Sequence, residues 1–155
     1  MNTSICRYLS TVGIVTLLGL ASLAYANAPT GRYTISNGSV YDNKTKLTWQ
    51  QAIPSTKYCW DCAKNYCASL GGSAWHLPTM KELQTILDYS HANPAVDPTA
   101  FPSTPSDYFW SSTPSAQYAS TTTPKAWAVE FTRGVARDFP SALDAGNEAY
   151  VRCVH

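Results

Sequence analysis

The stretch WHLPTMKEL, residues 75–83, carries the clearest local structural signal in this chain. Thr79 follows a proline and stands three residues before Glu82, which is the spacing of a capping box. In that motif the threonine hydroxyl and the glutamate carboxylate each accept a hydrogen bond from a free amide of the first helical turn. Apolar residues continue at helical spacing as far as Leu87. We therefore expect a helix that begins at Thr79 and fades near Tyr89.

Upstream of this helix we expect one more helix and a small antiparallel sheet. Residues 61–70 have apolar side chains at helical spacing, and Gly71-Gly72 ends the pattern. Asn37-Gly38 favours a type I′ turn between two strands, because both turn residues need positive φ. Three strand-like runs surround or follow this turn, at 32–35, 39–41 and 47–50.

Downstream of the helix the composition changes. Residues 90–124 are rich in Pro, Ser and Thr, and their aromatic side chains favour an ordered, packed loop with a short strand at 108–112. Thr132-Arg133-Gly134 predicts a hairpin between strands 126–131 and 135–139. Residues 149–154 alternate as a half-buried strand would. The pattern predicts an α+β domain, with two helices packed on small antiparallel sheets and a long Pro/Ser/Thr-rich loop region.

The first 26 residues have the pattern of a secretory signal peptide. One cation, Arg7, precedes an apolar run at 9–24, and Ala24-Tyr25-Ala26 matches the small-x-small pattern that signal peptidase cuts. The apolar run is shorter than the ~20 residues that a membrane-spanning helix needs. We expect residues 1–26 to be removed and residues 27–155 to form one exported domain, periplasmic, cell-surface or secreted, with no transmembrane segment.

The charge balance narrows the range of partners. The chain has 11 Lys and Arg against 10 Asp and Glu, and removal of Arg7 leaves the two signs equal. Nucleic acids and anionic membrane surfaces favour a basic excess, so neither is an expected partner.

Four cysteines remain after cleavage, and an even number in an exported domain indicates two disulfides with three possible pairings. The spacing favours Cys67–Cys153 and leaves Cys59–Cys62 as a small local loop. Two alternatives stay open. Cys59-Trp60-Asp61-Cys62 has the C-x-x-C form of a redox dithiol, although the βαβ context of thioredoxin-like proteins is missing. The first three cysteines with His76 could instead hold zinc, although their spacing is unfamiliar.

Two groups of residues are candidates for ligand binding. Trp60 lies between two cysteines beside Tyr58, so this pair is the better candidate for an exposed aromatic surface. A second candidate is a basic cluster near the last hairpin, which would suit sulfate or carboxylate. Its members are Lys125, Arg133 and Arg137. The alternative is a solvated face that Glu130 and Asp138 neutralise.

The sequence predicts no catalytic residue, cofactor or metal. Residues 71–75 do not form G-x-S-x-G, and His76 and His91 have no evident nucleophile or acid partner. Asn93-Pro94-Ala95 and Val96-Asp97-Pro98 are poor substitutes for the triplets of calcium-dependent lectins, and few acids are nearby. We therefore expect a protein that is not an enzyme.

Several of these segments together resemble one family. WHLPTMKEL at 75–83 is similar to its W-R-L-P-T-x-x-E-L signature, and FWSST at 109–113 and YVRCV at 150–154 match its W-S-S-T and Y-V-R-C-V elements. Residues 31–33, 37–38, 40–42 and 47–50 match its N-terminal pattern. The chain thus resembles the Lcl C-terminal domain family, named for the terminal domain of a bacterial collagen-like adhesin.

The resemblance implies a C-type-lectin-like fold in which a disulfide joins the first helix to the last strand. It also implies adhesion through recognition of a glycan or a surface protein, since the named adhesin binds sulfated glycosaminoglycans, and assembly as a trimer. Two alternatives remain. One is a structural or assembly component of the cell envelope. The other is an enzyme of the formylglycine-generating or dithiol-redox type, which would need free thiols.

Overall fold

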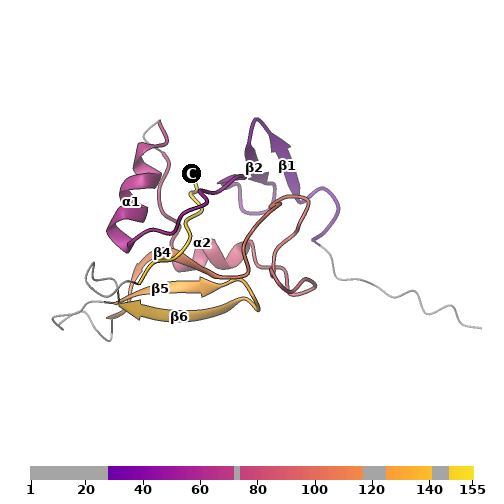
Figure 1. Cartoon of the computed structure of the whole chain (residues 1–155). Helices are drawn as coiled ribbons and strands as arrows, with labels where there is room; N and C mark the ends of the chain where they lie inside the picture. The colour runs from indigo at the N-terminus through magenta and orange to yellow at the C-terminus, as the bar shows by residue number, and fades with distance from the viewer. Residues whose placement is uncertain (1–27, 72–73, 117–124, 141–146) are drawn as a thin grey trace, which may run out of the picture.

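The computed structural model describes residues 28–71, 74–116, 125–140 and 147–155. The predicted signal peptide lies outside these residues. Within them, two helices and two three-stranded antiparallel sheets form an α+β fold, as predicted (Figure 1). None of the described helices is long and apolar enough to cross a membrane.

The first sheet contains β1 (Tyr33–Ser36), β2 (Ser39–Asp42) and β3 (Thr48–Gln50) in that order. Asn37 and Gly38 both have positive φ, 50° and 74°, and they close the predicted hairpin with Ser36 opposite Ser39. Val40 of β2 and Trp49 of β3 are paired and fully buried. This small sheet therefore supplies two large side chains to the core.

The two helices are α1 (Trp60–Ser69) and α2 (Met80–Thr85). Both hydrogen bonds of the predicted capping box are present at the start of α2, between Thr79 and Glu82. The helix ends at Thr85, however, and does not continue to near Tyr89 as expected. The Asp88 carboxylate accepts a hydrogen bond from the Ser90 amide at 2.9 Å, and this local turn replaces further helix.

The second sheet contains β4 (Tyr108–Pro114), β5 (Lys125–Glu130) and β6 (Val135–Pro140), with β5 in the centre. Strand β4 is longer than the expected 108–112. The paired residues Phe109 and Val129 belong to one buried cluster. The next pair, Trp110 and Ala128, belongs to a second cluster on the other face of the sheet. The sheet thus divides the core into two layers.

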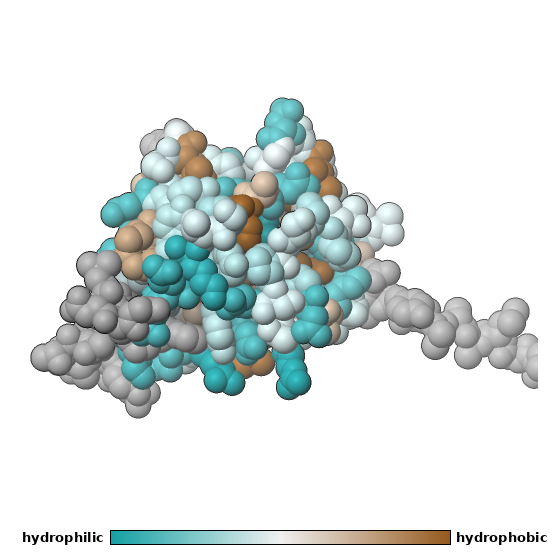
Figure 2. Space-filling view, in the orientation of Figure 1, coloured by the Kyte–Doolittle hydropathy of each residue, from teal (hydrophilic) through white to brown (hydrophobic). Residues whose placement is uncertain are grey.

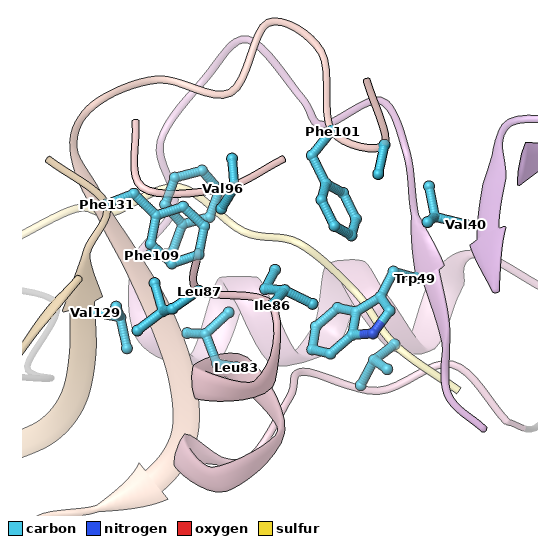
Figure 3. Close-up of a cluster of buried hydrophobic side chains, with 12 residues drawn as sticks. Val40, Trp49, Leu83, Ile86, Leu87, Val96, Phe101, Phe109, Val129 and Phe131 are labelled. Atoms are coloured by element: carbon cyan, nitrogen blue, oxygen red, sulfur yellow. The ribbon is translucent and has the colours of Figure 1, made fainter. Parts of the chain in front are cut away.

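The larger cluster joins both sheets to α2 and to the long loop (Figure 3). It combines side chains from both sheets, from α2 and from the loop that precedes β4. These include Val40, Trp49, Leu83, Ile86, Val96, Phe101, Phe109, Val129 and Phe131. The loop residues Val96 and Phe101 are almost completely buried, which confirms an ordered, packed loop for its described part, residues 90–116. Residues 117–124 lie outside the described part.

The C-terminal segment differs from the half-buried strand that its alternation predicted. Val151, Arg152, Cys153 and Val154 are all fully buried, whichever way their side chains point. The segment makes only isolated bridges, because it passes between other elements instead of lying along one strand (Figure 1). Those bridges join Tyr58 to Ala149, Phe109 to Tyr150, and Val154 to both Trp49 and His76.

Both predicted disulfides form. Cys67 of α1 is bonded to Cys153 of the C-terminal segment, and both residues are fully buried. Cys59, the residue before α1, is bonded to Cys62 in its first turn. The four cysteines among the described residues are therefore all paired in disulfides.

Arg152 is fully buried, and no carboxylate among the described residues is paired with it. Its two terminal nitrogens donate to the carbonyl oxygens of Gln50 (2.7 Å) and Gln51 (2.8 Å) and to the Thr104 hydroxyl (2.7 Å). The guanidinium also lies over the Phe101 ring, 4.7 Å from its centroid. Burial lowers the pKa of Arg152 to about 9. One side chain thus ties the C-terminal segment to β3 and to the long loop.

The surroundings of Asp42, at the end of β2, should make the free energy of unfolding depend on pH. Burial alone would raise the pKa of its carboxyl, but the hydrogen bond from Arg32, the hydrogen bond from the Lys44 amide and the positive charge of Arg32 together outweigh burial and lower that pKa. Because the pKa is lower in the folded state, the stabilisation is present above pH ~3.9, the ordinary value for Asp, and is lost as the pH falls through the folded value.

We expect Asp42→Asn to cost about 1–3 kcal/mol at pH 7 and less at pH 3, because the stabilisation that the Asp42 charge provides declines as the pH falls below ~3.9. Denaturant unfolding at a series of pH values measures this difference. Asp61→Asn is the matched control, since Asp61 forms an exposed ion pair with Lys64 and its loss should cost less than about 1 kcal/mol. An equal cost at both pH values would contradict the role of the Asp42 charge.

Candidate functional site

The structure does not bring the three predicted basic residues together. Lys125 begins β5 and forms an ion pair with Asp138, 3.8 Å away. Arg137 is paired with Ala128, so its side chain lies on the opposite face of the sheet from that of Lys125. Arg133 lies in the turn that follows the other end of β5. That end, Glu130, is five residues or about 17 Å from Lys125 along the strand. A single anion site built from all three is therefore excluded by their placement.

Tyr58 and Trp60 are close together, but both side chains make contacts within the fold that cover much of their surface. The Trp60 ring nitrogen donates to the Ser111 carbonyl at 2.7 Å, and Lys64 lies over the same ring, 3.8 Å from its centroid. Tyr58 packs against Tyr66, with ring centroids 5.1 Å apart. Both residues are half-buried against the second core cluster. Trp60 thus presents less free ring surface than its position between two cysteines indicated.

Another aromatic residue, Tyr89, is far more exposed. Its exposed fraction is 74%, compared with 44% or less for the other exposed large apolar side chains among the described residues. It lies beside the β5–β6 turn, where its hydroxyl is 3.4 Å from the Gly134 carbonyl oxygen. Arg133 and Val135, on either side of Gly134, are also exposed. We call Tyr89, Arg133, Gly134 and Val135 the Tyr89 face.

Hydrogen bonds with two neighbouring segments, residues 93–95 and Ser106, brace the backbone beneath the Tyr89 face. The Asn93 amide donates to the Thr132 carbonyl (3.1 Å), and the Ala95 amide donates to the Phe131 carbonyl (2.6 Å). The Thr132 hydroxyl donates to the Ser106 carbonyl at 3.1 Å. A surface held in this way loses little conformational entropy when a ligand binds.

Gly134 shows how closely Tyr89 is packed. Its φ is 72°, and a Cβ added there would lie 2.8 Å from a carbon of the Tyr89 ring and 3.3 Å from a Leu87 methyl. The glycine thus permits both the positive φ of the turn and the approach of the ring. The sequence pattern indicated the turn at Gly134 but not Tyr89, which we had expected at the end of a helix. The sequence Asp88-Tyr89-Ser90 is the signal that could have revealed it, because Asp favours a turn that ends the helix.

Two small hollows lie in the surface of the residues that the structure describes. One, of about 200 Å³, is lined by residues 28–33 with Ile35, Asp97, Thr99 and Ala100. The other, of about 190 Å³, is lined by residues 51–53 with Pro102 and Ser103. Both are smaller than the ~300 Å³ at which pockets for small organic ligands begin. Hydrophobic residues on the face shown in Figure 2 are scattered among polar ones and do not form one broad patch.

Two of the three histidines, His76 and His91, form local polar contacts. The His76 Nε2 lies 3.5 Å from the carboxylate of Glu82, which also closes the capping box with Thr79. The His91 Nε2 lies 3.9 Å from the Asp88 carboxylate. Among the described residues no group of three or more His, Cys, Asp or Glu side chains is arranged to hold a metal ion. Within that part of the chain, neither histidine contacts a nucleophile.

A family model described as the Lcl C-terminal domain matches residues 38–155. The chain belongs to the Lcl C-terminal domain family. That match extends from the first hairpin turn through the C-terminal segment. It therefore includes both disulfides, both helices and the Tyr89 face.

The match of this Lcl C-terminal domain to its family model confirms the resemblance that the sequence motifs indicated. The bridge from the first helix to the C-terminal segment is the one that the resemblance implied, and the two helices and two small sheets are those that the residue patterns predicted. Among solved structures, the chain is similar to the crystal structure of botrocetin, with 10% identity and a TM-score of 0.49. That alignment covers 81% of this chain and 96% of the botrocetin chain. No curated protein matches the sequence.

Proposed function

We propose that this Lcl C-terminal domain is an exported, non-catalytic binding module of the bacterial cell envelope that recognises a glycan through the Tyr89 face. The observation that carries the proposal is the 74% exposure of Tyr89, which lies beside the β5–β6 turn, where hydrogen bonds to neighbouring segments brace the backbone. An exposed aromatic ring on a rigid support offers a flat apolar surface with a polar edge. This arrangement suits the flat apolar face of a sugar ring.

Arg133 adds a group that can select among sugars. Its guanidinium can donate two parallel hydrogen bonds to a carboxylate or sulfate. Only one exposed arginine belongs to the face, and the positive and negative residues of the domain balance after removal of Arg7. We therefore propose a ligand in which single acidic groups accompany neutral sugars, with a weaker dependence on salt than a polyanion would show.

The signal-peptide pattern and the two disulfides support a location outside the cytoplasm. We propose that residues 1–26 direct export and are removed, and that residues 27–155 act outside the cytoplasm. Two disulfides in so small a domain are typical of an oxidising compartment. The alternative is that the ligand is a surface protein. This would fit a role for the domain as an assembly component of the cell envelope.

We expect Tyr89→Ala and Arg133→Ala each to weaken glycan binding by about tenfold or more, which corresponds to the loss of about 1.4 kcal/mol. A glycan array with residues 27–155 identifies the ligand, and calorimetry with the best ligand measures the affinity. Both side chains are exposed, so the free energy of unfolding should stay within about 0.5 kcal/mol of the wild-type value.

Two matched variants control for general surface effects. Tyr41→Ala removes another exposed aromatic residue, on the first sheet, and Lys125→Ala removes a cation at the far end of β5. Neither should change the affinity. Equal losses in the controls, or glycan binding that survives Tyr89→Ala, would place the site elsewhere. Failure of the wild-type domain to bind any glycan, with capture of a protein from the envelope, would favour the assembly role.

A further inference from the structure

The two disulfides of this domain lie in very different surroundings. Cys67 and Cys153 are fully buried, whereas Cys62 is exposed and Cys59 is half-buried at the start of α1. We propose that Cys59–Cys62 is a reversible thiol–disulfide exchange site, reduced by a dithiol in the compartment where the protein resides, while Cys67–Cys153 stays oxidised. This inference does not depend on the ligand of the Tyr89 face.

Access decides which of the four sulfurs can react. Exchange begins when a thiolate attacks one sulfur of a disulfide, so the attacked atom must be reachable from solvent. Cys62 is exposed in the first turn of α1, next to Asp61, whose carboxylate forms an exposed ion pair with Lys64 at 2.7 Å. Cys153 is enclosed in the second core cluster and is reachable only if the domain opens. Attack is therefore directed to Cys62.

The geometry also favours Cys59 as the leaving group. Cys59 is the N-cap residue of α1, and its sulfur accepts a hydrogen bond from the Cys62 amide at 3.1 Å. A thiolate at this position gains from that hydrogen bond and from the positive end of the helix. Both effects stabilise the anion that forms when the bond between the two sulfurs breaks.

The residues around this disulfide are held in place by contacts that do not involve it. Tyr58 and Ala149 exchange two backbone hydrogen bonds, of 2.9 and 3.1 Å. The Tyr58 carbonyl also accepts from the Trp110 ring nitrogen, and Trp60, between the two cysteines, is anchored to Ser111 by its own ring nitrogen. Reduction should therefore leave the first turn of α1 in its native position, with the two thiols close enough to oxidise again.

The exchange consists of two successive displacements at sulfur. A thiolate of the dithiol attacks the Cys62 Sγ, the bond to the Cys59 Sγ breaks, and Cys59 leaves as a thiolate. The second thiol of the reductant, as its thiolate, then attacks its own partner sulfur in the mixed disulfide and releases Cys62. The protein gains two electrons and two protons, and the dithiol becomes a disulfide.

The test is a titration of folded residues 27–155 with dithiothreitol, followed by alkylation and intact-mass measurement. We expect two alkylated thiols, at Cys59 and Cys62, with an unchanged near-UV circular dichroism spectrum and recovery of the disulfide after the reductant is removed. Cys67 and Cys153 should react at least about a hundredfold more slowly, because they must wait for the domain to open. Simultaneous appearance of four thiols, or loss of the near-UV spectrum with the first two, would overturn the proposal.

A second measurement identifies the attacked sulfur. A thioredoxin-type reductant with its second thiol replaced by serine should be trapped as a mixed disulfide on Cys62, as peptide mapping would show. After reduction, the Cys59 thiolate should titrate below ~8.5, the ordinary pKa of cysteine, when followed by its ultraviolet absorbance. Cys59→Ser should abolish this titration, while Cys62→Ser should retain a titrating thiol. Trapping on Cys59 alone would contradict the proposed direction of attack.

Discussion

Replacing Cys67 and Cys153 together with serine should lower the free energy of unfolding by about 4–5 kcal/mol. The bridge joins residues 86 apart, so its removal frees the unfolded chain from a constraint that spans most of the domain. Small domains have total stabilities of only about 5–15 kcal/mol, so much of the protein should be unfolded at 37 °C. Denaturant unfolding followed by tryptophan fluorescence measures the loss.

The second disulfide provides the matched control for this experiment. Cys59 and Cys62 are three residues apart, and the same chain-entropy relation gives a cost of about 2 kcal/mol for the double serine variant. The expected order of stability is wild type, then the variant lacking the short bridge, then the variant lacking the long one. Equal losses for the two variants would mean that native-state packing, and not loop length, determines the contribution of each bridge.

Arg152→Met should cost about 3–5 kcal/mol, although methionine keeps much of the side-chain volume. The substitution removes the donor from three acceptors, the partly buried carbonyls of Gln50 and Gln51 and the buried hydroxyl of Thr104. Arg152→Lys should fall between wild type and Arg152→Met, because one ammonium group cannot reproduce the planar geometry of a guanidinium. Thermal and denaturant unfolding measure both variants.

Arg137→Met is the control for the Arg152 variants. Arg137 is exposed on β6, so its replacement should change the free energy of unfolding by no more than about 0.5 kcal/mol. A cost below about 1 kcal/mol for Arg152→Met would show that other donors or water satisfy the three acceptors. In that case the guanidinium would not be the element that ties the C-terminal segment to β3 and the long loop.

Local patterns in the sequence predicted the elements that local chemistry determines. The capping box at Thr79, the turn at Asn37-Gly38 and the hairpin around Gly134 are all present where the residues indicated them. Each depends on a few neighbouring residues and on the φ angles or hydrogen bonds that those residues allow. The spacing of the cysteines likewise led to the correct pairing.

The sequence was less informative where distant segments compete for the same residues. The alternation at 149–154 indicated one exposed face, but β3, α1 and β4 enclose the segment, and Arg152 finds its acceptors on residues about a hundred positions away. For the same reason the exposure of Tyr89 was missed, since it depends on a helix end and on a turn 45 residues further along the chain. Lys125, Arg133 and Arg137 were grouped by sequence proximity, which ignores the two faces of a strand.

The burial of the C-terminal segment has a consequence for the time at which the domain can fold. Residues 149–154 complete hydrogen bonds to β3, β4 and the segment before α1, and the His155 amide still donates to the Thr48 carbonyl at 2.9 Å. These residues are the last of this sequence to leave the ribosome. A nascent chain therefore lacks a central part of its core until residues 149–155 are available, so the domain cannot complete its fold before then. Under the export that we propose, this delay would keep the polypeptide in the extended form that a translocation channel accepts.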